Sequence, residues 1–131
     1  LYAEYLAQRL NSPFEPLLMK KFWRQKVPIK HPKLGLVSSG ELPESHDVQA
    51  FAMTLRQLRS NPTQASLYLQ RRPGVQFGKQ IIVVVDGLLT FGCTDEITSM
   101  FDIRIFIDGD KAKCRLERYR RDQKITVDVK N

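Results

Sequence analysis

Two aspartates and a group of arginines are the residues whose types and positions point to chemistry. Asp86 follows the apolar run 81–85 and precedes Gly87, and Asp108 follows a second apolar run at 103–107. The next segment is crowded with arginines, which are Arg115, Arg118, Arg120 and Arg121. Acids at the carboxyl ends of parallel strands lie where α/β sheets bind ligands, and arginine neutralises phosphate charge. The combination predicts half of a phosphoryl-transfer site, although an aspartate can also cap a turn and arginines can line a solvated face.

A second concentration of positive charge lies in the first third of the chain. The segment 16–40 contains no acidic residue, and its cations are Lys20, Lys21, Arg24, Lys26, Lys30 and Lys33. Because Phe22 and Trp23 lie among these cations, the segment is suited to hold RNA by phosphate contacts and base stacking. The alternative interpretation is a solvated loop whose aromatic side chains anchor it to the core.

Composition bounds the class of protein. The 131 residues fit one domain, 1–131, and the net charge of +7 with a pI near 9.7 favours anionic partners, though it also serves solubility. No run of 18 apolar residues occurs, so no membrane span is expected. Cys93 and Cys114 form no C-x-x-C pair and are interpreted as reduced core thiols, which argues against secretion. His31 and His46 lie far apart, so no metal site is expected.

The hydrophobic pattern predicts an α/β fold with a mainly parallel sheet. Helices are expected at 1–10, at 47–59 with Ser45 or Asp47 as cap, after Thr94, and from Asp110 onward with Ala112, Leu116 and Tyr119 facing inward. Strands are expected at 16–19, 81–85, 103–107 and 124–129, and the proline-punctuated stretch up to Gly40 is expected to be a loop.

Several of these segments together resemble the uridine kinase and nicotinamide riboside kinase family of P-loop kinases. The matching stretches are Asp86-Gly87-Leu88-Leu89-Thr90-Phe91, Phe101-Asp102-Ile103-Arg104-Ile105-Phe106-Ile107-Asp108, Arg115-Leu116-Glu117-Arg118 with Arg121-Asp122, and Glu41-Leu42-Pro43-Glu44-Ser45-His46-Asp47. The resemblance implies an incomplete three-layer, mainly parallel sheet of the P-loop kinase type. It also implies family-equivalent positions at Asp86, Gly87, Asp108, Arg115, Arg118 and Arg121, with Asp86 near metal or substrate and the arginines on phosphates.

The chain departs from this family where catalysis would depend on it. It contains no G-x-x-x-x-G-K-[ST] motif, whose backbone cradles nucleotide phosphates. Lys20 and Lys21 stand where the resemblance would place the catalytic acids, and an ammonium group neither accepts a proton nor attracts magnesium. We therefore expect no catalytic residue and no cofactor, with ATP and magnesium as the alternative if a P-loop precedes Leu1.

The resemblance also implies a central strand between the runs 81–85 and 103–107. We expect this place to be filled by the tail strand, by a segment preceding Leu1, or by another chain, because unpaired buried backbone is costly. Direct pairing of the two runs would contradict the family topology.

Three functional hypotheses follow. The first is a non-catalytic, kinase-like subunit of a larger assembly, for which we favour a mitochondrial ribosome or a respiratory complex. Its partners would be other protein chains and, in a ribosome, ribosomal RNA. The second is a fragment of an ATP-dependent nucleoside or nicotinamide riboside kinase. The third is a nucleic-acid-binding module. Expected localisation is mitochondrial, otherwise cytoplasmic, and the expected anion-binding residues are Lys20, Lys21, Trp23, Arg24, Lys26, Lys30, Lys33, Arg118, Arg120 and Arg121.

Overall fold

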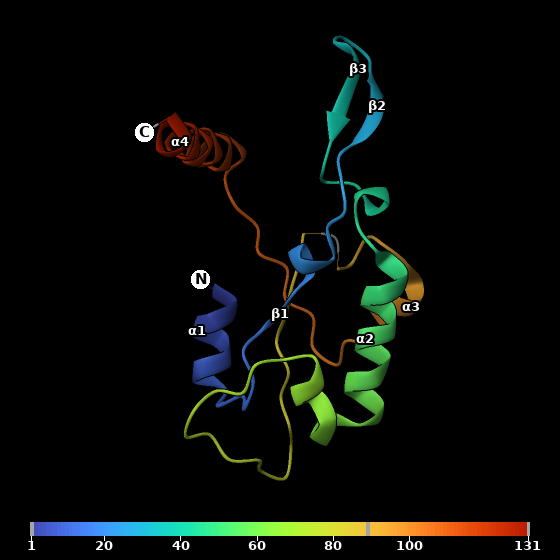
Figure 1. Cartoon of the computed structure of the whole chain (residues 1–131), viewed down its shortest axis with the longest axis vertical. Helices are drawn as coiled ribbons and strands as arrows, with labels where there is room; N and C mark the ends of the chain where they lie inside the picture. Colours follow the sequence, from blue (N-terminus) through green and yellow to red (C-terminus); the bar gives the residue numbers. More distant parts are fainter. Residues whose placement is uncertain (1, 89, 131) are drawn as a thin grey trace.

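The protein is a mixed α/β structure with a small parallel sheet and a separate antiparallel pair of strands (Figure 1). The structure is a computed structural model that describes residues 2–88 and 90–130, with 124–130 described for the backbone alone. Its elements are α1 (Tyr2–Arg9), β1 (Leu17–Leu18), η1 (Met19–Phe22), β2 (Val27–His31), β3 (Gly35–Ser39), η2 (Pro43–Ser45), α2 (Val48–Ser60), η3 (Pro62–Leu67), β4 (Val85–Asp86), α3 (Asp95–Ser99) and α4 (Lys111–Lys130).

The centre of the molecule is the parallel pairing of β1 with β4. Leu17 lies opposite Val85 and Leu18 opposite Asp86, so both strands end at the same edge. This confirms that the segments predicted as strands at 16–19 and 81–85 come together in parallel. The regular ladder is shorter than the apolar run, because only its last residue and Asp86 form β4.

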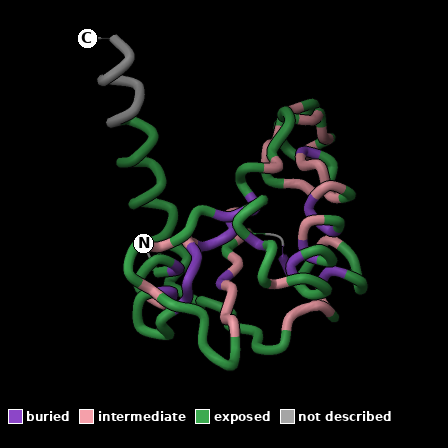
Figure 2. Tube along the Cα trace, turned by 60° about the horizontal axis from the view of Figure 1, so that its bottom comes forward, coloured by how far each residue is buried: buried purple, intermediate pink, exposed green. Residues whose placement is uncertain are grey.

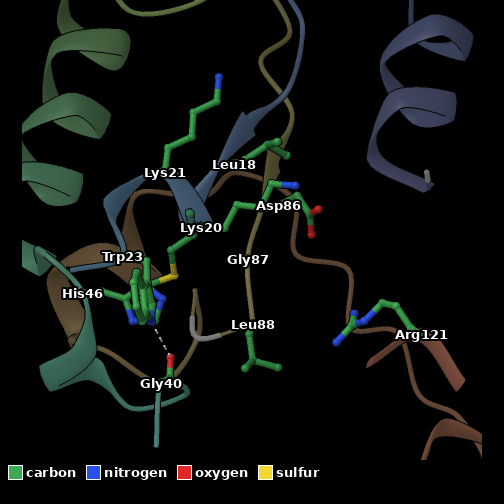
Figure 3. Close-up of a pocket in the computed structure, with 11 residues that line it drawn as sticks. Leu18, Lys20, Lys21, Trp23, Gly40, His46, Asp86, Gly87, Leu88 and Arg121 are labelled. Carbon is green, nitrogen blue, oxygen red and sulfur yellow. Dashed lines mark hydrogen bonds between the residues drawn. The ribbon is translucent and has the colours of Figure 1, made fainter. Parts of the chain in front are cut away.

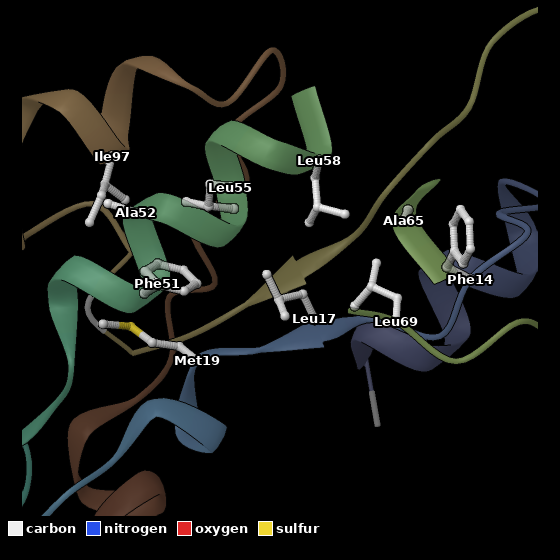
Figure 4. Close-up of a cluster of buried hydrophobic side chains, with 10 residues drawn as sticks. All are labelled: Phe14, Leu17, Met19, Phe51, Ala52, Leu55, Leu58, Ala65, Leu69 and Ile97. Atoms are coloured by element: carbon white, nitrogen blue, oxygen red, sulfur yellow. The ribbon is translucent and has the colours of Figure 1, made fainter. Parts of the chain in front are cut away.

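Helices cover both faces of this parallel pair. Ala3 and Ala7 of α1 pack against Val84 on one side. On the other side, α2 and neighbouring segments form the main core, which is drawn in Figure 4 and consists of Phe14, Leu17, Met19, Phe51, Ala52, Leu55, Leu58, Ala65, Leu69 and Ile97. Figure 1 shows β1 running between α1 and α2. Coverage of both faces explains why the run 81–85 is apolar without alternation.

The short-range signals for helix starts are confirmed. Asp47 caps α2 by accepting a hydrogen bond from the backbone N–H of Ala50 at 3.0 Å. Thr94 caps α3 by accepting from the N–H of Ile97 at 3.1 Å. Asp110 accepts from the N–H of Lys113 at 2.8 Å at the start of α4. In each case a short polar side chain satisfies an N–H that the first helical turn leaves unpaired.

The stretch expected to be a loop up to Gly40 is instead a β-hairpin. Strands β2 and β3 pair antiparallel from Val27 opposite Ser39 to His31 opposite Gly35. The prolines favoured a loop because proline has no N–H to donate to a neighbouring strand. Pro28 is tolerated here because the hairpin has only two strands, and each has an open edge. At the turn, the Nδ1 atom of His31 accepts hydrogen bonds from the N–H groups of Lys33 and Leu34 at 3.1 and 3.0 Å.

The prediction of a buried strand at 103–107 is wrong in this structure. The segment carries no strand assignment, and Ile103 and Phe106 are 82% and 79% exposed. An apolar run becomes a strand only when a neighbouring strand supplies its hydrogen-bond partners, and no described strand lies in register with it. β4 pairs with β1, and the run 103–107 is not paired with β4. The pairing that would contradict the kinase-like topology is therefore absent among the described strands.

The prediction of a tail strand at 124–129 is also wrong, because α4 continues through these residues to Lys130. No glycine or proline interrupts the sequence from Lys111 to Lys130, so nothing local stops the helix. The tail therefore does not fill the place between the runs 81–85 and 103–107. Figure 2 shows α4 projecting from the body, and Ala112, Leu116 and Tyr119, expected to face inward, are exposed.

The two cysteines differ in their surroundings. Cys93 is half-buried and packs against the main core, as expected for a core thiol. Partial burial raises the pKa of the Cys93 thiol, and the nearby carboxylate of Glu44 adds to the rise. Cys114 is exposed on α4, so its assignment to the core is wrong.

Candidate functional site

An open cleft of about 780 Å³ lies where β1 and β4 end (Figure 3). Its lining residues are Leu18, Met19, Lys20, Lys21, Trp23, Gly40, His46, Asp86, Gly87, Leu88 and Arg121. Since β1 and β4 are parallel, their carboxyl ends meet at one edge, which is where α/β sheets commonly bind ligands. The sequence-predicted residues Lys20, Lys21, Trp23, Asp86, Gly87 and Arg121 are thus brought together here.

The floor of the cleft is the tight 3₁₀ turn η1, which follows β1 directly. Met19 is 1% exposed and anchors this turn in the core, while the next two side chains, Lys20 and Lys21, are exposed. Neither lysine forms an ion pair with any residue that the structure describes. In Figure 3 the Lys21 side chain extends away from Asp86, so we place Lys21 at the rim.

Gly87 lets the end of β4 approach this turn closely. A Cβ atom at position 87 would lie 2.5 Å from Cβ of Met19 and 2.8 Å from Cγ2 of Thr90. These distances are far below van der Waals contact, so any side chain at 87 would push β4 and η1 apart. Glycine at position 87 therefore allows close packing, which lets Asp86 lie beside η1 at the exposed edge of the sheet.

One wall of the cleft is the indole of Trp23, which is 47% exposed. Its Nε1–H donates to the carbonyl oxygen of Gly40 at 3.2 Å, and a Cβ at Gly40 would lie 2.9 Å from Nε1. The backbone on either side is also fixed, because the N–H of Arg24 donates to Ser45 O and the N–H of Asp47 donates to Phe22 O, both at 2.7 Å. The ring is thus held in place while much of its surface stays open.

Sequence reasoning missed His46, which lines the same wall. Its Nδ1 atom lies 3.0 Å from the carbonyl oxygen of Leu42, so Nδ1 carries the proton and donates. The residue also faces Trp23 through an isolated antiparallel bridge. The sequence signal was its position between Ser45 and Asp47 in the stretch that resembles the kinase family, but His46 carried no predicted role in binding. The other lining residues that were missed are Leu18, Gly40 and Leu88.

The opposite wall is provided by α4. Arg121 reaches from this helix toward the end of β4 (Figure 3), and its Nε lies 3.4 Å from a carboxylate oxygen of the adjacent Asp122. Arg118 instead forms an ion pair with Glu41, which follows the hairpin. The hydrogen bond from Arg118 to Glu41 raises the pKa of Arg118, and the charge of Glu41 acts in the same direction. This pair ties α4 to the segment beside Gly40.

The remaining predicted residues lie outside the cleft. Asp108 is exposed and accepts a hydrogen bond from the N–H of Gly109 at 2.9 Å, as a turn cap does. Arg24 is paired with Asp47 at 2.6 Å. This contact, after the hydrogen bond from the Ala50 N–H, lowers the pKa of Asp47. The other cations are exposed: Lys26, Lys30 and Lys33 on or beside the hairpin, and Arg115 and Arg120 on α4.

The charges that line the cleft favour an anion. Its described lining contains the cations of Lys20, Lys21 and Arg121 against the one carboxylate of Asp86. No cluster of three or more histidine, cysteine, aspartate and glutamate side chains suited to a metal occurs in the described part of the chain. Among the same residues, no helix is both long and apolar enough to cross a membrane.

Comparison of the chain with protein-family models, with curated proteins and with solved structures gave no match.

Proposed function

We propose that this chain is a non-catalytic, kinase-like interaction subunit of a larger assembly that binds an anionic partner surface through the cleft. The observation that carries the proposal is that Lys20 and Lys21 line the same cleft as Asp86, at the edge where β1 and β4 end. A phosphoryl-transfer enzyme needs an acceptor for the substrate's proton and a place for magnesium near this edge. An ammonium group supplies neither, whereas it attracts a bound anion.

The kinase-like fold type is part of this proposal. It is supported by the parallel pairing of β1 with β4, by the Asp86-Gly87 pair at the strand end, and by helices on both faces. The arginine-bearing helix α4 beside the cleft agrees with the lid-like segment that the resemblance implies.

An exposed apolar run supports participation in a larger assembly. Ile103, Ile105, Phe106 and Ile107 are all exposed in one short segment. Contiguous exposed apolar side chains of this kind mark surfaces that other proteins cover. We favour a mitochondrial ribosome or a respiratory complex as the assembly, with mitochondria as the compartment and the cytoplasm as the alternative.

Co-sedimentation of the tagged protein from cells tests this function. We expect the protein to travel with a large particle, and we expect Lys20→Glu with Lys21→Glu to release it, because the change reverses the charge of the cleft floor. The matched control is Lys79→Glu, which makes the same kind of change at an exposed position outside the cleft lining. A protein that sediments only as a free monomer overturns the proposal.

The second candidate is a fragment of an ATP-dependent nucleoside or nicotinamide riboside kinase. It is favoured by Asp86 and Arg121, which lie in one cleft as an acid and a phosphate-binding arginine would. Isothermal titration of the full-length protein with ATP, with and without magnesium, distinguishes the two. Tight magnesium-dependent binding with turnover of a nucleoside would establish the kinase and exclude the non-catalytic subunit.

A further inference from the structure

We propose that the cleft binds one nucleotide unit of a single-stranded nucleic acid, with a backbone phosphate between Lys20 and Arg121 and the base against Trp23. The inference rests on the proposed function in one respect, which is that the cleft binds an anion. It adds the class of ligand and a role for the aromatic wall.

The cleft contains two cations that a ligand can reach. Two of the nearby arginines are already neutralised, Arg24 by Asp47 and Arg118 by Glu41. Lys20 forms no ion pair within the described part of the chain, and Arg121 pairs through Nε with the carboxylate of the adjacent Asp122. A phosphate is therefore the group that Lys20 and Arg121 are best placed to hold.

The aromatic wall is built to receive a flat ring. Trp23 is nearly half exposed, yet its indole is held by the hydrogen bond to Gly40 and by the close approach of the Gly40 backbone. A ring that is already fixed loses little freedom when a base stacks on it. Stacking on an aromatic side chain is also insensitive to base identity, so no sequence preference is expected from Trp23.

The surroundings favour a polymer over a mononucleotide. Positive charge continues from the cleft in two directions, onto the hairpin through Lys26, Lys30 and Lys33 and along α4 through Arg115 and Arg120. Figure 1 shows the hairpin and α4 projecting toward the same end of the molecule. Gly40, which follows β3, and Arg121 of α4 both line the cleft. A single strand can lay successive phosphates along such a path, and its unpaired bases are free to stack, whereas duplex bases are not.

Titration with a ten-nucleotide oligo(U) RNA tests the inference directly. Trp23 is the only tryptophan in the chain, so a base that stacks on it quenches the intrinsic fluorescence of the protein. We expect quenching by oligo(U) but not by the same length of duplex RNA or by heparin. We also expect the logarithm of the affinity to fall linearly with the logarithm of the salt concentration.

Two kinds of variant separate the phosphate contacts from the stacking, using the anisotropy of labelled oligo(U). Lys20→Gln with Arg121→Gln should weaken binding and lower the salt slope by about 0.7, the value for one phosphate of a single strand, because the two cations hold the same phosphate. Trp23→Ala should weaken binding by about tenfold or more at every salt concentration with the slope unchanged, and Trp23→Phe should retain most of the affinity. Lys79→Gln is the control for charge, and circular dichroism checks that each variant is folded.

The outcomes distinguish this inference from the proposed function. If heparin or polyglutamate binds as well as oligo(U) and the fluorescence does not change, the nucleotide assignment is overturned while anion binding survives. If ATP or UMP binds as tightly as oligo(U), the polymer assignment is overturned. If no polyanion binds and the protein still travels with its assembly, the cleft is not the interaction surface and both the inference and the anion-binding role fail.

Discussion

Gly87 lies at a position where the surrounding atoms leave no room for a Cβ atom. Gly87→Ala should lower the free energy of unfolding by about 1–3 kcal/mol, because the new Cβ would overlap Met19, whose side chain is fixed in the core. Urea unfolding followed by circular dichroism measures the change. Gly92→Ala is the matched control, since a Cβ there meets nothing within 4 Å. Equal midpoints for the two variants would contradict the close approach of β4 and η1.

Asp47 links the stability of α2 to pH. Its pKa is lowered by the hydrogen bond from the Ala50 N–H and then by Arg24, so the folded state favours the ionised form. The stabilisation is present above the ordinary aspartate pKa of about 3.9 and is lost as the pH falls through the lower folded value. We expect the stability difference between wild type and Asp47→Asn, which keeps the cap acceptor, to shrink between pH 6 and pH 3. A constant difference would contradict this linkage.

At the residue scale, sequence reasoning succeeded where the physics is local. The helix starts at Asp47 (with Ser45 as the alternative cap), Thr94 and Asp110 were predicted, because capping depends only on a short side chain and the next turn of the helix. His46 was missed because its position on the wall depends on contacts with Leu42 and Trp23, which no local pattern encodes.

At the element scale, the run 103–107 is the feature with the clearest experimental consequence. Ile103→Lys with Phe106→Lys should leave the unfolding midpoint almost unchanged, because both side chains are already exposed. The double variant should self-associate less and should be released from the assembly, because an exposed apolar surface has been made charged. Light scattering and co-sedimentation measure the two effects. Leu67→Lys is the control, as Leu67 is 75% exposed on η3. A large loss of stability in the double variant would show that the run is buried.

The two wrong strand predictions share one physical cause. Helices α1, α2 and α3 were predicted because a helix forms its hydrogen bonds within its own segment. A strand depends on a neighbour, and the apolar pattern at 103–107 and the alternation at 124–129 contain no information about whether one is present. The hairpin of β2 and β3 was missed for the opposite reason, since Pro28 and Pro32 obscured a pattern whose partner lies only a few residues away.

At the scale of the whole molecule, the ion pair between Arg118 and Glu41 connects the two projecting elements at their bases. Glu41→Gln should raise the affinity for labelled oligo(U) by a few fold, because it frees Arg118 and removes a negative charge beside the cleft. Anisotropy at several salt concentrations measures the gain. Glu4→Gln on α1 is the control for net charge, and an equal gain in both variants would show that the position of Glu41 has no importance.

The same ion pair joins α4 to the segment that follows the hairpin, and its strength depends on the salt concentration around it. Both partners are exposed, and an exposed pair of this kind contributes about 1 kcal/mol or less and is screened by salt. A polyanion that reaches Arg118 replaces Glu41 by an equivalent partner, so releasing α4 from the hairpin base costs almost nothing net. We therefore expect a bound polyanion to loosen the connection between α4 and the segment that follows the hairpin.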